Sequence, residues 1–227
     1  MLTVACVLKG NWCAGRGPEY VRNLKASVER NLSEKHRFLC VTDLDQERAR
    51  RELGCEWRRP KHPDWPGWWG KIEIFDPEFA PGPILFFDLD TVIVGPLDFP
   101  DMHERPFTCL EDFTRPALMA SGMMYLPAGA ELARVYAEFV KNPAWAVQFC
   151  GDHGDGLWMQ LQLGRCWTWQ TSDPGKVVSY KVHVRGQAEL PAGARVVCFH
   201  GVPRPHEIDE PWMIDHWNDA PRLPEAA

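Results

Sequence analysis

Apolar residues recur along this chain in two patterns, as short continuous runs and as runs with a helical period. Residues 2–8 form an apolar run typical of a buried strand, and Pro18 opens a segment whose apolar positions keep helical spacing. A second apolar run follows at 38–41. This order predicts a parallel sheet covered by helices, with ligands binding beyond the carboxyl ends of the strands.

The same patterns predict further elements and a single domain. A length of 227 residues with 45% hydrophobic content is enough for one sizeable core and short for two. We therefore predict one α/β domain over residues 1–206 and a C-terminal tail over 207–227 that packs on the body. The further elements are helices at 45–53, about 68–79, 130–141 and 157–163, and strands at 84–87, 91–94, 107–110, 123–126 and 195–199.

Charge, hydropathy and cysteine spacing argue against a nucleic-acid-binding protein, a membrane-spanning protein and a zinc or redox protein. A net charge of −6 offers no basic surface for nucleic acid or an anionic membrane, and no apolar stretch reaches the length of a membrane span. Residues 1–8 lack a basic leader region and end before Lys9, which indicates a first strand rather than a signal peptide. The eight cysteines form no CxxC pair, so zinc and redox motifs are unsupported. We expect reduced thiols and a cytoplasmic protein.

Two acidic residues follow directly after the apolar run at 84–87. Asp88 and Asp90 are two positions apart, so on a strand both side chains point to the same face and can converge on one divalent cation. An alternative is that they simply end a strand in a turn, which Asp favours. The immediate start of the next strand at 91–94 leaves little room for that turn.

A second chemical signal lies near the end of the domain. His200 ends a predicted strand, Gly201 lets the backbone approach a bound group, and Arg204 offers a forked donor for phosphate oxygens. A lone histidine at a strand end is more often a structural residue. Its combination with an acidic strand favours a metal ligand here.

Taken in order, these motifs resemble the GT-A-fold nucleotide-sugar glycosyltransferases, in particular the glycogenin-like retaining enzymes of family 8. The resemblance spans most of residues 2–206, and its specificity lies in the order and spacing of motifs that are individually weak. The shared elements are Tyr20, Thr42-Asp43, Lys71, Phe86-Phe87-Asp88-Leu89-Asp90, Ser121-Gly122-Met123-Met124, the segment 152–156, His200-Gly201 and Arg204-Pro205.

The resemblance implies a donor site and a metal. Asp88, Asp90 and His200 are expected to hold Mn²⁺, or Mg²⁺, on the diphosphate of a UDP-sugar, because mixed oxygen and imidazole ligands suit manganese. Lys71 and Arg204 would stabilise the leaving diphosphate together with the metal. The implied nucleotide contacts are Val7, Leu8, Tyr20, Lys71, Asp88, Ser121, Gly201 and Arg204, although Tyr20 could equally be a helix residue that packs on the sheet.

The resemblance also implies an acidic pair at the donor sugar and acceptor. Asp152 and Asp155 match this pair, and either could instead cap the helix predicted at 157–163. Gly156 stands where the family usually has an amide side chain, and Ala120 where an Asn often precedes Ser-Gly. These departures leave the sugar and the stereochemical outcome open, although the family is a retaining one. The family's usual lysine is replaced by Arg204, which preserves the charge.

Eleven tryptophans are present, and three of them cluster just ahead of Lys71. Trp65, Trp68 and Trp69 could form a stacking platform for an acceptor sugar or could cover the sheet edge. Aromatic residues supply much packing area, so we expect at least two of the three to be packed.

Two other functions are weighed against the transferase. The run from Asp88 to Val92 also resembles the signature of haloacid-dehalogenase-type phosphatases, with Asp88 as nucleophile and Asp90 as acid/base. In that superfamily the motif normally ends the first strand, whereas here a complete βαβ unit precedes it and His200 has no role. The third candidate is a non-catalytic carbohydrate-binding protein. The sequence thus predicts a metal-dependent transferase that moves a sugar from a UDP-sugar to a carbohydrate, protein or small-molecule acceptor.

Overall fold

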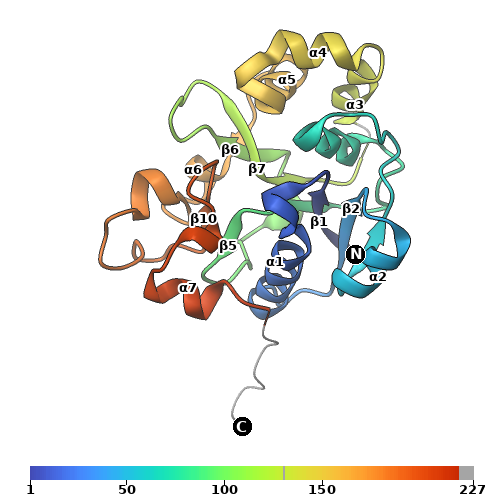
Figure 1. Ribbon diagram of the computed structural model, residues 1–227. Helices are drawn as coiled ribbons and strands as arrows, with labels where there is room; N and C mark the ends of the chain where they lie inside the picture. The colour runs from blue at the N-terminus through green and yellow to red at the C-terminus, as the bar shows by residue number, and fades with distance from the viewer. Residues whose placement is uncertain (130, 220–227) are drawn as a thin grey trace.

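A computed structural model of the chain describes residues 1–129 and 131–219. A seven-stranded sheet with the order β3-β2-β1-β4-β7-β6-β8 forms its centre, with helices on both faces (Figure 1). All neighbouring strands in it are parallel except that β7 runs antiparallel to β4 and β6. The predicted α/β class with a mostly parallel sheet is therefore confirmed. The strands are β1 (Leu2–Leu8), β2 (His36–Thr42), β3 (Glu56–Arg58), β4 (Ile84–Phe87), β6 (Thr108–Glu111), β7 (Met119–Leu126) and β8 (Trp167–Thr168).

A second sheet of three strands was not foreseen from the sequence as a separate unit. It consists of β5 (Thr91–Ile93), β10 (Val196–Cys198) and β9 (Val177–Ser179), in that order. β5 begins one residue after Asp90, so the segment 88–90 is the link between the two sheets. β10 pairs antiparallel with β5, which brings the late part of the chain beside the acidic link.

Seven α-helices surround the sheets in the described residues. The helix predicted after Pro18 is α1, and the helix predicted at 45–53 begins with the Asp45 side chain accepting a hydrogen bond from Arg48 N–H. The prediction missed α4, because its Trp145 and Phe149 are apolar but exposed. The helices are α1 (Gly17–Asn31), α2 (Gln46–Glu52), α3 (Ala133–Phe139), α4 (Pro143–Cys150), α5 (Gly154–Leu163), α6 (Trp169–Ser172) and α7 (Pro211–His216).

The helix predicted over about 68–79 differs in type from the one observed. The segment Gly67–Phe75 is a 3₁₀ helix, and every residue in it from Trp69 to Phe75 is buried. A helix that is buried on all sides gives no amphipathic stripe from which a period can be read. The predicted helix at 130–141 is shorter in the structure, and residue 130 lies outside the described residues.

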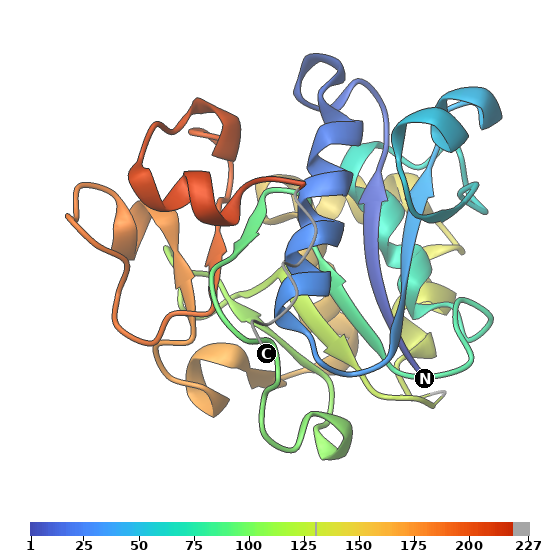
Figure 2. The same ribbon diagram turned by 90° about the horizontal axis from the view of Figure 1, so that it is seen from below.

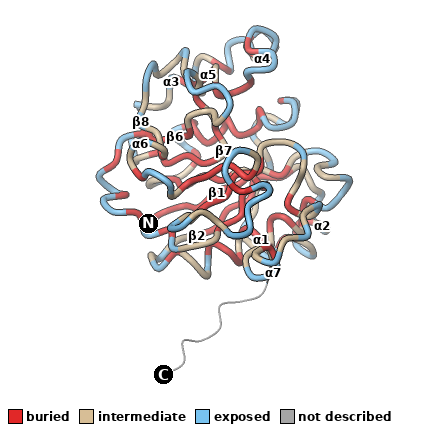
Figure 3. Tube along the Cα trace, turned by 90° about the vertical axis from the view of Figure 1, so that its left-hand side faces the viewer, coloured by how far each residue is buried: buried red, intermediate tan, exposed pale blue. Residues whose placement is uncertain are grey.

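Two hydrophobic cores lie on the opposite faces of the large sheet. Val4 and Cys6 of β1 pack on the side of α1, whereas Ala5 faces the 3₁₀ segment and helices α3 and α5. This alternation follows from the two-residue repeat of a strand. Figure 2 shows α1 on one side of the sheet, and Figure 3 shows the central strands as the buried part of the chain.

The segment after β10 returns to the body of the domain. Met213 of α7 is buried in the core of the small sheet, and the ring of Trp217 meets the ring of Tyr20 edge-on at 4.7 Å. Ser27 Oγ donates a hydrogen bond of 2.9 Å to His216 O. The part of the predicted tail at 220–227 lies outside the described residues.

All eight cysteines are free thiols in the structure. Among the helices of residues 1–129 and 131–219, none combines the length and the apolar character that crossing a bilayer requires.

Candidate functional site

A cleft of about 480 Å³ opens where the acidic link passes from one sheet to the other. It lies beyond the carboxyl ends of β1 and β4, where a parallel sheet is expected to bind ligands. Most residues singled out from the sequence line it, and they come from segments more than 190 residues apart. These residues are Val7, Lys71, Asp88, Asp90, Ser121, Asp155, His200, Gly201 and Arg204.

Three residues singled out from the sequence do not line this cleft. Leu8 is buried and packs against Gly17 at the start of α1. Asp152 is exposed in the short turn Gly151–His153. Tyr20 is buried, its hydroxyl is hydrogen-bonded to His206 Nδ1, and its ring meets Trp12 edge-on at 4.4 Å. Since Trp12 does line the cleft, Tyr20 contributes to the site by supporting Trp12.

Lys71 is a buried cation that lines the cleft. Its ammonium donates hydrogen bonds to Asp88 Oδ1 at 2.6 Å and to Ser121 Oγ at 2.9 Å. Asp155 Oδ2 lies 3.6 Å from it, as a longer ion pair. Burial lowers the pKa of Lys71, but the charges of Asp155 and Asp88 outweigh burial and raise it, so the side chain is cationic. Asp88, Ser121 and Asp155, which lie far apart in the sequence, thus all contact the Lys71 ammonium.

One carboxylate oxygen of Asp155 accepts no hydrogen bond from the described residues. The residue is 7% exposed, and its Oδ2 has no hydrogen-bond partner among the described residues. A buried carboxylate oxygen without a donor is unfavourable unless a ligand or solvent supplies one. The Asp155 side chain is therefore suited to accept a hydrogen bond from a hydroxyl of a bound molecule.

Asp90 and Arg204 form the second charged pair of the cleft. The Arg204 guanidinium makes an ion pair with Asp90 and lies over the ring of Trp12, 5.1 Å from its centroid. Burial and the charge of Asp88 raise the pKa of Asp90 to about 7, against the opposing effect of Arg204. Two carboxylates that repel each other in a buried link are suited to a divalent cation, which would lower that repulsion.

His200, the third predicted metal ligand, is engaged elsewhere. Its Nε2 is hydrogen-bonded to Ser179 Oγ at 2.7 Å, and its ring stacks on Phe113 at 5.8 Å between centroids. Burial, followed by the charge of Lys181, lowers the pKa of His200. Within residues 1–129 and 131–219, no three His, Cys, Asp or Glu side chains are arranged to hold a metal. The structure thus does not bring His200 together with Asp88 and Asp90 as a three-ligand group.

Cys198 is a buried core residue that also lines the cleft. It pairs with Thr91 in the small sheet and lines the cleft beside the acidic link. Burial, followed by the charges of Asp90 and Asp88, raises the pKa of its thiol. The sequence carried no signal for this, because only the antiparallel pairing of β10 with β5 brings residue 198 to the link.

The mouth of the cleft is built by the β6–β7 loop, residues 112–118, and by the segment before α5. Arg115 donates a hydrogen bond of 2.8 Å to His153 Nδ1 and is held by the Asp112 carboxylate at 3.0 Å. This contact joins the two walls of the cleft. No local motif marks this loop in the sequence, because its residues act through a long-range contact.

The Trp-rich loop divides as expected. Trp65 and Trp69 are buried in the core, whereas Trp68 is 61% exposed and lines the cleft. The expectation that at least two of the three tryptophans pack is therefore confirmed. The remaining indole is available at the mouth of the cleft.

Gly156 is fixed by a close approach of backbone. A Cβ at this position would lie 2.1 Å from Met119 O, so no side chain fits without moving β7. An amide side chain at position 156 would therefore clash with this backbone. The backbone of Gly156 and Met119, rather than a side chain at position 156, therefore lines the cleft beside Asp155.

No protein-family model and no curated protein sequence matches this chain. Solved structures with the same architecture do match. The galactosyltransferase LgtC, in complex with donor and acceptor sugar analogues, has a TM-score of 0.58 at 13% identity, over 89% of this chain and 88% of that chain. An active-site glutamine-to-glutamate variant of LgtC has a TM-score of 0.61 at 12% identity, over 98% of both chains.

A second similar protein is the glycosyltransferase GlyE of Streptococcus pneumoniae TIGR4. Its TM-score is 0.62 at 12% identity, over 92% of this chain and 58% of that chain, so the present chain spans somewhat more than half of GlyE. These structural similarities confirm the predicted GT-A fold. At identities this low, they establish the fold alone. The fold alone does not establish the reaction, which rests on the site.

Proposed function

We propose that this chain is a glycosyltransferase that moves a sugar from a nucleoside-diphosphate donor, a UDP-sugar, to a hydroxyl of an acceptor. The observation that carries the proposal is the buried Lys71, held by Asp88, Asp155 and Ser121 at the floor of the cleft. The fold is similar to that of solved glycosyltransferases, which favours a transferase over the haloacid-dehalogenase alternative.

The cationic groups fit the charge that develops in such a reaction. Breaking the bond between sugar and phosphate leaves a diphosphate whose negative charge must be stabilised. Lys71 pairs with Asp88, Arg204 pairs with Asp90, and both cations line the cleft. Arg204 can donate two parallel hydrogen bonds to phosphate oxygens, and Lys71 acts as a point charge.

A divalent cation belongs to this proposal, with Mn²⁺ or Mg²⁺ as the candidates. Asp88 and Asp90 would hold it, and it would supply a Lewis acid at the diphosphate when bound. His200 lines the same cleft, and its hydrogen bond to Ser179 would have to break before it could join them. Binding of the cation would also free Lys71 and Arg204 to turn from the carboxylates to the phosphates.

The sugar and acceptor sides of the site follow from the remaining groups. The Asp155 carboxylate lines the cleft and would accept a hydrogen bond from a hydroxyl of the donor sugar. Trp68, Arg115 and His153 form the open mouth through which an acceptor would enter. We further propose that the transfer retains the anomeric configuration, as the family resemblance implies. Proton spectra of the anomeric centre in the product test this.

A thermal-shift screen tests the donor class. The chain is heated with UDP, GDP, CDP and their sugars, each with and without Mn²⁺, because a ligand that binds the native state raises the melting temperature. At a concentration about 100 times its Kd, a ligand stabilises by about 2.7 kcal/mol. UDP and UDP-sugars with Mn²⁺ should give the largest shifts, and uridine alone should give little. No shift from any nucleoside diphosphate would remove the proposal.

A further inference from the structure

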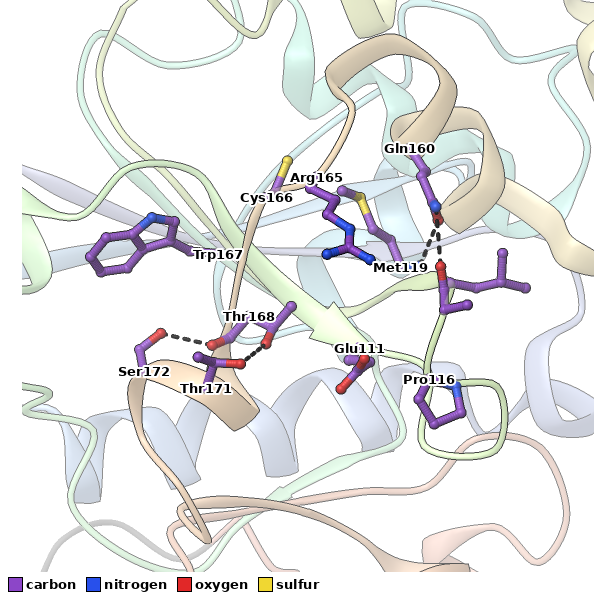
Figure 4. A pocket seen from close by; sticks show the side chains of 12 residues that line it. Glu111, Pro116, Met119, Gln160, Arg165, Cys166, Trp167, Thr168, Thr171 and Ser172 are labelled. Carbon is purple, nitrogen blue, oxygen red and sulfur yellow. Dashed lines mark hydrogen bonds between the residues drawn. The ribbon is translucent and has the colours of Figure 1, made fainter.

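A second cavity, of about 540 Å³, lies beside the cleft and has no role in the proposed reaction. It is bounded by β6, the β6–β7 loop, the end of α5 and the segment from β8 to α6. Figure 4 shows this space with Trp167 on one side and with Pro116 and Gln160 on the other. A volume of this size is typical of sites for small organic ligands.

The walls of the cavity are held in place by hydrogen bonds. The Gln160 side chain accepts from Met119 N–H at 3.1 Å and donates to Ala117 O at 3.1 Å. Thr168 Oγ1 donates to Thr171 Oγ1 at 3.0 Å on the opposite wall. These contacts fix both walls, so the cavity is formed before a ligand arrives.

Three side chains in the cavity are presented without such contacts. Trp167 is 57% exposed on the edge strand β8, an unusual position for so large an indole. Arg165 is exposed, and neither its guanidinium nor the Glu111 carboxylate forms a hydrogen bond or ion pair with another side chain in the part of the chain described. An indole face with one cation and one carboxylate is a suitable surface for a hydroxyl-rich ring.

The cavity and the cleft lie on either side of the β6–β7 loop. Met119 lines both spaces, and the loop ahead of it supplies Pro116 and Ala117 to the cavity and Asp112 and Arg115 to the cleft. The loop is therefore a shared wall. A molecule reacting in the cleft could extend over this wall into the cavity.

We propose that the second cavity binds the distal sugar units of an oligosaccharide acceptor whose reacting hydroxyl lies in the cleft. This inference rests on the proposed function. The distal ring stacks on the Trp167 indole, Arg165 donates to its ring or hydroxyl oxygens, and Glu111 accepts from its hydroxyls. The acceptor is then a glycan chain or glycoconjugate rather than a small alcohol.

Binding to immobilised oligosaccharides, with no donor present, tests the inference. The probes are neutral and sialic-acid-containing oligosaccharides, whose separate signals show whether Arg165 selects an acidic sugar. The matched variants are Trp167→Ala and Trp145→Ala, because Trp145 is also exposed, at 51%, but lies on α4 and lines neither space. Trp167→Phe retains an aromatic face and serves as the conservative variant.

Trp167→Ala should weaken the strongest glycan signal at least about tenfold, which corresponds to 1.4 kcal/mol. Trp145→Ala should leave that signal unchanged, and Trp167→Phe should recover most of it. UDP affinity, measured on the same proteins, should be equal in all of them. Wild-type protein that binds no oligosaccharide, or equal glycan binding by Trp167→Ala, overturns the inference. A wild-type protein that binds oligosaccharides but no UDP would instead overturn the proposed function.

Discussion

Lys71 and Asp88 form an ion pair of 2.6 Å at the floor of the cleft, with the lysine side chain only 4% exposed. The pair joins the 3₁₀ segment Gly67–Phe75 to the link between the two sheets. It is therefore both a structural contact and the source of positive charge at the candidate donor site.

Lys71→Met should destabilise the protein and remove diphosphate binding. Removing one partner of a buried ion pair leaves an uncompensated charge, which typically costs about 3–5 kcal/mol. Lys61→Met is the matched control, because Lys61 pairs with Asp76 at 2.7 Å but its side chain is half exposed. Urea unfolding of both variants checks the prediction. Equal changes in the free energy of unfolding would show that Lys71 is no more than a surface charge.

Arg204→Ala should weaken UDP binding far more than uridine binding. Hydrogen bonds to charged groups contribute about 1.5–3 kcal/mol, so the loss for UDP should be tenfold or more, whereas uridine has no phosphate to lose. Calorimetry with both ligands measures the difference. Arg204→Lys keeps the charge and should lose less. Equal losses for uridine and UDP would contradict the assignment.

Asp155→Asn should separate sugar recognition from nucleotide recognition. The amide is similar in size and keeps an oxygen, but it removes the charge that faces a donor hydroxyl, so affinity for the UDP-sugar should fall towards that for UDP. Asp152→Asn is the control, because Asp152 is exposed and does not line the cleft. The measurement is the ratio of Kd values for UDP-sugar and UDP. If Asp152→Asn changes this ratio more than Asp155→Asn does, Asp152 rather than Asp155 recognises the sugar.

Asp90→Asn should change how stability depends on pH in metal-free protein. The folded pKa of Asp90 is about 7, and the unfolded pKa is about 3.9. Between these values the native chain keeps a proton that the unfolded chain has released, so wild-type stability falls as pH rises through this window. Asparagine cannot ionise, so the stability of the variant relative to wild type should increase from about pH 5 to about pH 8.

Urea unfolding in the presence of EDTA across this pH range measures the effect. Asp76→Asn is the control, because its ion pair with Lys61 contributes to lowering the pKa of Asp76 and so confines its titration to more acidic conditions. The relative stability of Asp76→Asn should stay constant from about pH 5 to about pH 8. If the stability of Asp90→Asn relative to wild type stays constant from about pH 5 to about pH 8, Asp90 is ionised over that whole range.

The sequence predicted the parts of the site that depend on local pattern. Asp88 and Asp90 were found because they end an apolar strand, and Arg204 because it follows a glycine turn. Lys71 was placed by resemblance, and its burial among two carboxylates became visible only in the fold. The fold class followed from the strand, helix and strand that open the chain.

Other parts of the site depend on contacts that no local pattern records. Cys198 reaches the acidic link through the pairing of β10 with β5, and His200, two residues on, is held by Ser179 of β9. Trp12 separates Tyr20 from the cleft, although only Tyr20 was singled out from the sequence. These relations arise from the second sheet, whose strands are three residues long and too short to show a period.

Phosphorus spectra of a UDP-sugar incubated with the chain, Mn²⁺ and an oligosaccharide mixture test the central claim most directly, because they show which bond breaks. Transfer cleaves the bond between sugar and diphosphate, so the account predicts that UDP accumulates and that Lys71→Met abolishes its formation. The accumulation of UMP with a sugar phosphate would reveal a different reaction. An unchanged spectrum for the sugars of UDP, GDP and CDP alike would contradict the account.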